Sequence, residues 1–156
     1  MELPQDWSEF LSLLVGQKVR FLLIGGHAMA AHGAPRFTGD LDVWVQPGKR
    51  NAERVMKALV AFGFGSVKGL SDADFTSPGT VVALGHPPMR IDLLTSVSGV
   101  TFERAWRRRR AAILGGVPLS VIGVEDLIAN KRAAARPKDL VDVATLEALS
   151  ATRRRG

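Results

Sequence analysis

The sequence predicts an α+β (α/β) domain with one mixed β-sheet flanked by helices and a helical C-terminal part. Short β-rich apolar runs dominate the first two thirds of the chain, and helical patterns fill the last part. The 156 residues are 46% hydrophobic and 23% charged, which is a normal balance for one globular domain. We therefore expect a single domain over residues 1–150 and a basic C-terminal tail over 151–156.

The first elements alternate between helix and strand. Apolar residues at helical spacing predict a short amphipathic helix over residues 6–15. The apolar run over 19–24 stops at Gly25-Gly26, which predicts a buried strand followed by a tight turn. The alanine-rich segment 27–33 predicts a short helix ended by its last glycine. A second strand is expected over 40–45.

The middle of the chain continues the alternation. An apolar stripe predicts an amphipathic helix over residues 49–64. Residues 66–79 are polar and rich in turn formers, so we expect an exposed loop there. Two further apolar runs, over 80–85 and 89–95, predict two more strands.

The last third predicts one hairpin between helices. Residues 101–110 have a helical pattern, and 111–122 contain a glycine pair between short apolar runs, which indicates a β-hairpin. Two helices are expected over 123–135 and 137–150. They separate before Pro137, a residue that suits the first position of a helix.

Composition limits the classes of function. The net charge of +6 comes largely from two arginine runs, Arg107–Arg110 and Arg153–Arg155, and favours acidic partners such as nucleic acid or polyphosphates. The alternative is a solvated surface and a frayed tail. Without cysteine, disulfides, thiolate catalysis and zinc–thiolate sites are excluded, which fits the cytoplasm. Neither a membrane span nor a signal peptide is expected.

Two acidic residues interrupt the second predicted strand. Asp40 and Asp42 are two positions apart, so in a strand their side chains project to the same face, roughly 6 to 7 Å apart. Burying two carboxylates together raises the pKa of at least one of them. A divalent cation removes that penalty, and magnesium is commonly held by one or two carboxylates together with phosphates and water.

A third acid, Asp92, lies in another apolar run. On an adjacent strand it would complete a site for two metal ions or act as a general base. Other interpretations remain open: Asp40 as a turn residue after Gly39, and Asp92 as an ion-pair partner of Arg90. Three acids in apolar strands favour the functional interpretation.

The glycine turn lies 14 residues before Asp40. Gly25 and Gly26 would let the backbone approach a phosphate at the start of a helix, although an ordinary tight turn is the alternative. Arg36 and Thr38, just before the acids, would contact phosphate oxygens or organise the loop.

Lys131 follows Leu127 and Ile128 by four and three residues, so it lies on an apolar helical face. A lysine there snorkels outward or meets an anion, either a triphosphate or a buried acid. Asp139 is expected chiefly to favour the dipole of the last helix. We expect His27 and His32 to make local packing contacts, because five residues is a poor spacing for two ligands.

The segments "GGHAMAAHGAPRFTGDLDVWV", "RIDLLT" and "VIGVEDLIANKRAAARPKDLVDVATL" resemble the nucleotidyltransferase superfamily with the polymerase β-type fold. They are most similar to small bacterial nucleotidyltransferase-like domains, including those of abortive-infection toxin systems. The resemblance covers about residues 19–148. One departure is His27, at a place where the superfamily often has serine.

The resemblance implies functions for particular residues. Gly25 and Gly26 would hold the nucleotide phosphates, and Asp40 and Asp42 would ligate magnesium, with one or two ions bound. Asp92 would be the third ligand or the base. Lys131 matches a lysine that contacts the triphosphate in toxin relatives, while Lys138 and Asp139 match the start of the last helix motif.

The implied reaction is Mg²⁺-dependent transfer of a nucleoside monophosphate from a nucleoside triphosphate to an acceptor hydroxyl. RNA such as a tRNA end, a protein, and a small molecule such as an antibiotic are all open as acceptors. The alternatives are a catalytically inactive binding or regulatory module with the same fold, for example an antitoxin partner, and a basic nucleic-acid-binding protein. Aromatic residues are only 6% of the chain, which argues against a base-stacking surface.

Overall fold

The structure, a computed structural model, describes residues 3–35, 39–63 and 69–155 and contains one six-stranded mixed sheet. The strand order is β3-β4-β2-β1-β6-β5. The strands are β1 (Phe21–Ile24), β2 (Leu41–Val45), β3 (Val81–Leu84), β4 (Ile91–Leu94), β5 (Arg110–Leu114) and β6 (Val117–Val121). β2 is parallel to β4 and β1 to β6, whereas the other three neighbouring pairs are antiparallel.

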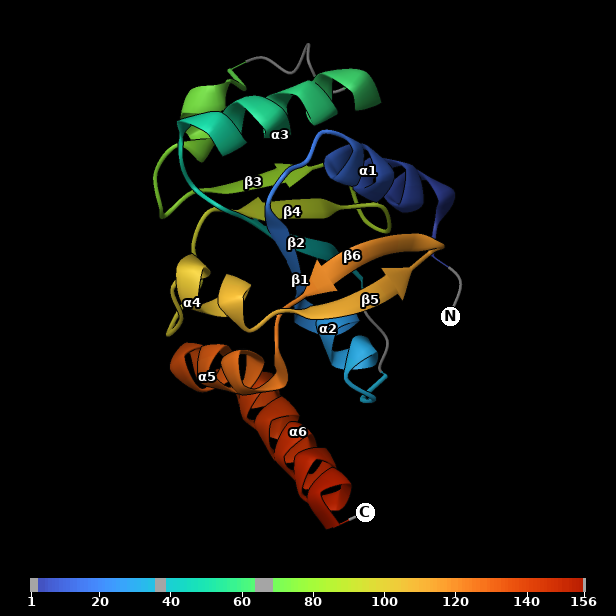
Figure 1. Cartoon of the computed structure of the whole chain (residues 1–156), viewed down its shortest axis with the longest axis vertical. Coiled ribbons are helices and arrows are strands. Elements are labelled where there is room, and N and C mark those ends of the chain that lie inside the picture. The colour runs from blue at the N-terminus through green and yellow to red at the C-terminus, as the bar shows by residue number, and fades with distance from the viewer. Residues whose placement is uncertain (1–2, 36–38, 64–68, 156) are drawn as a thin grey trace.

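Helices lie on both sides of the sheet, which confirms the predicted fold class. In Figure 1, α1 (Gln5–Gly16) and α3 (Lys49–Phe62) lie above the sheet. The other four lie below it: α2 (Gly25–Ala31), α4 (Phe102–Arg107), α5 (Val124–Ala134) and α6 (Pro137–Arg155). In the ranges that the structure describes, no helix combines the length and apolar character that crossing a membrane requires.

The two faces of β2 have different neighbours. Leu41, Val43 and Val45 are fully buried on one face, and Asp42 and Trp44 alternate with them on the other. The Trp44 ring meets Phe102 of α4 edge-on, with 5.2 Å between the ring centroids. The face that carries Asp42 is therefore closed by α4 at its Trp44 end.

Two sequence predictions were partly wrong. The helix expected over 101–110 ends at Arg107, because Arg110 already pairs with Val121 in the β5–β6 hairpin. The segment 66–79, expected to be an exposed loop, contains the short 3₁₀ helix η1 (Asp72–Phe75), and Phe75 is fully buried in the core. At the C-terminus, the residues of the expected basic tail continue α6 up to Arg155.

A buried asparagine ties α3 to the sheet. The Asn51 side chain accepts a hydrogen bond from the backbone N–H of Arg20 (2.8 Å). It also donates to the carbonyl oxygens of Arg20 (3.0 Å) and Gln46 (2.8 Å). These backbone groups flank β1 and β2, so one side chain fixes the start of α3 against two strand ends.

Replacing Asn51 by leucine should lower the free energy of unfolding by about 3 kcal/mol, because three partly buried hydrogen bonds to the backbone are lost. Urea denaturation of the purified variant measures this. The control is Glu53→Ala, an exposed substitution on the same helix, with an expected change within about 0.5 kcal/mol. Equal stability of the two variants would show that Asn51 does not anchor α3.

Candidate active site

Asp42 and Asp92 lie opposite each other on neighbouring strands. In the parallel β2–β4 pair, Asp42 is in register with Asp92, so both side chains project from the same face of the sheet. On the other side of β2, Asp42 is in register with Ile24, the last residue of β1. The acids that the sequence places far apart are therefore neighbours.

Arg90 links Asp92 to Asp40. Its Nε donates to Asp92 Oδ1 at 2.9 Å and lies 3.9 Å from Asp40 Oδ2. Asp40 lies just before β2 and joins the same acidic group. The Arg90–Asp92 ion pair, one of the alternatives considered from the sequence, is thus present together with the convergence of the three acids.

The carboxyl group of Asp42 is electrostatically strained. Burial, followed by the negative charges of Asp92 and Asp40, raises its pKa from 3.8 to about 6. The positive charges of Lys138 and Arg136 act in the opposite direction and limit the shift. Near neutral pH most of this carboxyl group is ionised at an unfavourable position, so a nearby cation would stabilise it.

The glycine turn is packed against Asp42. Gly25 has φ +69°, and a Cβ atom at this position would overlap the Asp42 carboxylate. Both the backbone conformation and the available space therefore require glycine. Gly25 and Gly26 open α2, where the first backbone N–H groups have no partner within the helix. The turn thus places next to the acid backbone donors that have no partner within the helix.

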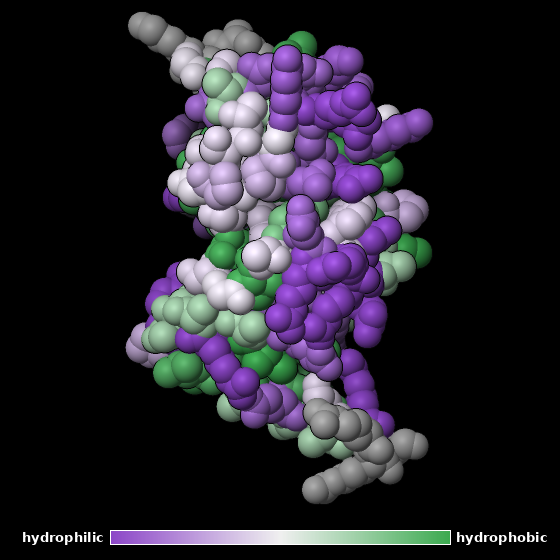
Figure 2. Space-filling model, turned by 60° about the vertical axis from the view of Figure 1, so that its left-hand side comes forward, coloured by the Kyte–Doolittle hydropathy of each residue, from purple (hydrophilic) through white to green (hydrophobic). Residues whose placement is uncertain are grey.

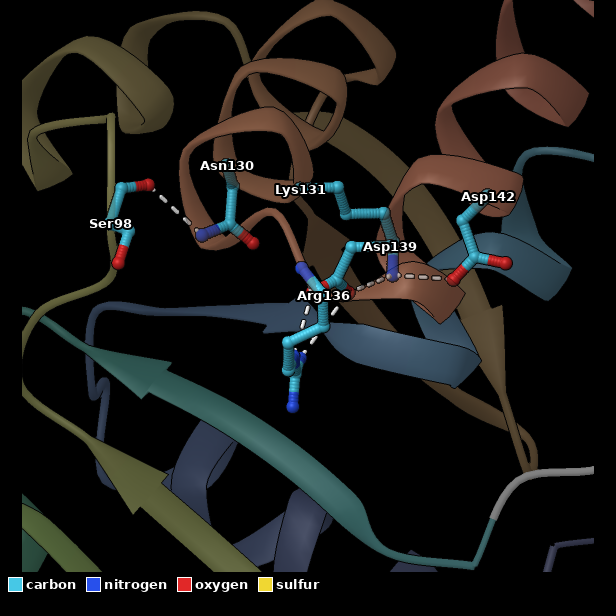
Figure 3. Close-up of polar contacts among 6 residues, drawn as sticks. All are labelled: Ser98, Asn130, Lys131, Arg136, Asp139 and Asp142. Carbon is cyan, nitrogen blue, oxygen red and sulfur yellow. Dashed lines mark hydrogen bonds and ion pairs between the residues drawn. The ribbon is translucent and has the colours of Figure 1, made fainter.

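A buried lysine joins α5 to α6. Lys131 is 8% exposed, and its Nζ lies 2.8 Å from Asp142 Oδ2 and 3.7 Å from Asp139 Oδ1 (Figure 3). Lys131 thus meets buried acids, one of the two kinds of anion expected for it from the sequence. The sequence prediction missed Asp142, although its spacing of three residues from Asp139 places both on one helical face.

Arg136 completes this network. Its guanidinium donates to both carboxylate oxygens of Asp139, at 2.7 and 3.2 Å, and its backbone N–H donates to Oδ2 at 3.2 Å. Burial alone would raise the pKa of Asp139, but the hydrogen bonds and charge of Arg136 hold this pKa below its usual value. Asp139 is therefore a cap and ion-pair partner, and it does more than favour the helix dipole.

Two adjoining cavities meet at Asp42. A cavity of about 490 Å³ extends past Asp92 to the neutral polar side chains Ser96, Ser98 and Asn130. A smaller one, about 220 Å³, extends past Gly26 to Asp40 and Lys138. Residues that border both are Gly25, Asp42, Lys131, Arg136 and Asp139. Asn130 also donates a hydrogen bond to the Ser98 carbonyl (3.0 Å) at the rim of the larger cavity.

The histidine within α2 and the one at the C-terminal end of this helix are both packing residues, as expected. The His27 ring meets Trp7 edge-on at 5.4 Å, and burial lowers its pKa. His32 Nε2 lies 2.6 Å from the Ile122 carbonyl oxygen. Arg36 and Thr38 lie outside the described residues.

The carboxylates suit magnesium in their chemistry, because Mg²⁺ prefers hard oxygen ligands. As the side chains stand, the described part of the chain contains no group of three or more His, Asp or Glu residues arranged to hold a metal ion. Arg90 Nε lies 2.9 Å from Asp92 and 3.9 Å from Asp40, so an ion bound by all three acids would compete with this cation.

Comparisons with known proteins agree with this fold. The crystal structure of the lincosamide antibiotic adenylyltransferase LnuA with lincomycin bound has a TM-score of 0.56 and 11% identity, covering 95% of this chain and 98% of that chain. A candidate nucleotidyltransferase from Thermotoga maritima has a TM-score of 0.57 and 15% identity, with 99% and 98% covered. At these identities the likeness establishes the fold alone.

No curated protein matches the chain. The model of a family described as nucleotidyl transferases of unknown function (DUF2204) matches residues 4–154, nearly the whole length. The chain therefore belongs to this nucleotidyl transferase family.

Proposed function

We propose that this protein is a Mg²⁺-dependent enzyme that transfers a nucleoside monophosphate from a nucleoside triphosphate to an acceptor hydroxyl. The observation that carries the proposal is the alignment of Asp42 with Asp92 beside the Gly25 turn, at the junction of two cavities. Paired carboxylates are costly to bury. A site that brings them together next to unpaired backbone donors is suited to a cation and a polyphosphate.

Asp40, Asp42 and Asp92 would hold the metal, as one or two ions. Bound there, magnesium would neutralise the acids and stabilise charge on the attacking and leaving oxygens. The protein's own contribution is to hold Asp42 and Asp92 in register on rigid strands and to keep Gly25 clear of the carboxylate. Arg90 would exchange its ion pairs for solvent or for a phosphate.

The smaller cavity would take the triphosphate. It is bordered by the Gly25-Gly26 turn and by the positively charged side chains of Lys131, Arg136 and Lys138. The glycine N–H groups would donate to phosphate oxygens, and the cations would balance phosphate charge. Lys131 would do so while it stays paired with Asp142.

The chemistry is an in-line displacement at the α-phosphorus. The acceptor oxygen forms a bond to phosphorus, the bond to the oxygen that leads to the β-phosphate breaks, and pyrophosphate leaves. The acceptor proton passes to Asp92 or to water. Because the reacting groups are positioned by the sheet and the helix pair, positioning and fixed charges supply most of the catalysis.

The larger cavity would receive the nucleoside or a small acceptor. Its volume of about 490 Å³ lies in the usual range for ligand pockets, and Ser96, Ser98 and Asn130 offer neutral polar contacts. LnuA modifies a lincosamide antibiotic, so a small-molecule acceptor is one version of the proposal. RNA such as a tRNA end, as in a toxin, and a protein hydroxyl are the others. The cysteine-free chain fits work on cytoplasmic nucleotides.

The first test is transfer of label from α-phosphate-labelled nucleoside triphosphates to three acceptor classes: total RNA, lysate proteins and small hydroxylated antibiotics. With Mg²⁺ present, one class should be labelled, and chelation should stop the reaction. Asp42→Asn and Asp92→Asn should each lower the rate by about 100-fold or more. Glu53→Gln, a matched amide substitution on the surface, should retain the wild-type rate. If Asp42→Asn labels acceptors as fast as the wild type, the proposed site is wrong.

A second test uses the raised pKa of Asp42 in the metal-free protein. The folded-state pKa of about 6 exceeds the ordinary value of 3.8, so the stability that protonated Asp42 contributes is present below pH 4. It is lost as the pH rises through about 6. Asp42→Asn should therefore be more stable than the wild type at pH 7.5, by up to about 3 kcal/mol, and equally stable at pH 4.

Thermal unfolding of both proteins with a chelator, at these two pH values, measures the difference. Mg²⁺ should then stabilise the wild type at pH 7.5 and leave Asp42→Asn unchanged. A stability difference that does not depend on pH would contradict the burial of an acid pair at this position.

A further inference from the structure

A stack of flat groups extends from the core to the surface at α4. Trp44 meets Phe102 edge-on, and the Phe102 and Trp106 rings are stacked with centroids 5.7 Å apart at 20°. The Arg109 guanidinium carbon lies 4.0 Å from the centre of the Trp106 ring. Arg109 Nη1 also donates to the Trp106 carbonyl at 2.8 Å, which holds the guanidinium over the ring. The stack therefore ends in a preorganised, exposed cation.

Further arginines lie near this end of the stack, one in space and two in the sequence. The Arg20 guanidinium carbon lies 5.7 Å from the Trp106 ring centre. The exposed Arg107 and Arg110 lie two positions before and one position after Arg109 in the chain. We call Arg20, Trp106, Arg107, Arg109 and Arg110 the arginine platform. In the part of the chain that the structure describes, its four arginines form no ion pair, whereas Arg104 and Arg108 both pair with Asp126.

Helix α3 lies next to the segment that carries Arg20. Arg54 of α3 donates to the Lys18 carbonyl at 3.4 Å, so α3 adjoins the segment that carries Arg20. Figure 2 brings the left-hand side of Figure 1 forward and shows hydrophilic residues running from the top of the molecule to its middle.

The geometry favours one class of polyanion. A guanidinium stacked on an aromatic ring leaves its outer face available for a nucleobase, and Arg planes stack with unpaired bases in RNA-binding proteins. The neighbouring arginines would bind the phosphates on either side. An acidic protein or an anionic membrane would use the charge but not the flat, fixed orientation of Arg109. A duplex would hide its bases within the helix.

We propose that the arginine platform binds single-stranded polynucleotide, with one base stacked on Arg109 and the flanking phosphates held by Arg20, Arg107 and Arg110. This goes beyond the proposed transferase reaction, because it concerns binding at a different surface. Asp42→Asn, which should abolish transfer, should bind the polynucleotide as the wild type does. A failure of the transferase proposal and a failure of the binding proposal can therefore be told apart.

The test is fluorescence anisotropy with a labelled single strand of about 12 nucleotides, a length within the known range of site sizes. RNA, DNA of the same sequence and the corresponding duplex are compared. Arg109→Lys keeps the charge but removes the flat face, so it should weaken single-strand binding about tenfold. The matched control Arg107→Lys should stay within about twofold, since a phosphate contact needs charge alone. Unchanged thermal unfolding of both variants confirms that they are folded.

Tighter binding of the single strands than of the duplex, with loss in Arg109→Lys, supports the proposal. Preference for RNA over DNA would add a contact to the 2′-hydroxyl, and equal affinity would limit the contacts to bases and phosphates. Binding that is equally tight for the duplex, or equally tight in Arg109→Lys, would reduce the platform to a nonspecific charged surface and overturn the proposal. Absence of single-strand binding at about 50 mM salt would also overturn it.

Discussion

The repulsion between Asp42 and Asp92 is the constraint on which the site depends. Parallel pairing of β2 with β4 sets the two carboxylates opposite each other, and burial raises the pKa of Asp42 to about 6. The surroundings are arranged to tolerate this charge. Gly25 leaves space for the carboxylate, Arg90 pairs with Asp92, and Arg136 lies close enough to lower the pKa of Asp42. A polyphosphate with its cation would relieve the same repulsion more fully.

The α5–α6 pair supplies the opposite wall of the site. Lys131 is buried with Asp139 and Asp142, and a charge in such a place is stable only when its partners are complete. The network therefore fixes the relative position of the two helices and, with it, the side of both cavities that faces Asp42. Fixed charges of this kind need no reorganisation during a reaction, which is how a small protein can stabilise phosphate charge.

Much of the fold was predictable from local pattern, because apolar periodicity and glycine pairs mark most strand and helix ends. The convergence of the acids was predictable from Asp42 and Asp92 in apolar runs, but their register depends on a strand pairing that no local pattern encodes. The sequence predicts Lys131 on an apolar helical face, and the spacing of Asp142 from Asp139 places both acids on one face of α6. Their contact with Lys131 depends on the packing of α5 against α6, which no local pattern encodes. Trp106 and Arg109 lie in a segment whose pattern predicts one helix. Arg109 stacks on the Trp106 ring beyond the end of this helix, which lies at Arg107.

The most direct measurement of the central claim is proton release on metal binding. Titrate the protein at pH 6 with Mg²⁺ and a non-hydrolysable nucleoside triphosphate, in two buffers of different ionisation enthalpy. At this pH about half of the Asp42 carboxyls are protonated, so each binding event should release about half a proton, which Asp42→Asn should not release. Binding that is equally tight without Mg²⁺, or that releases the same number of protons in Asp42→Asn, would contradict the claim that a metal resolves the repulsion between these two acids.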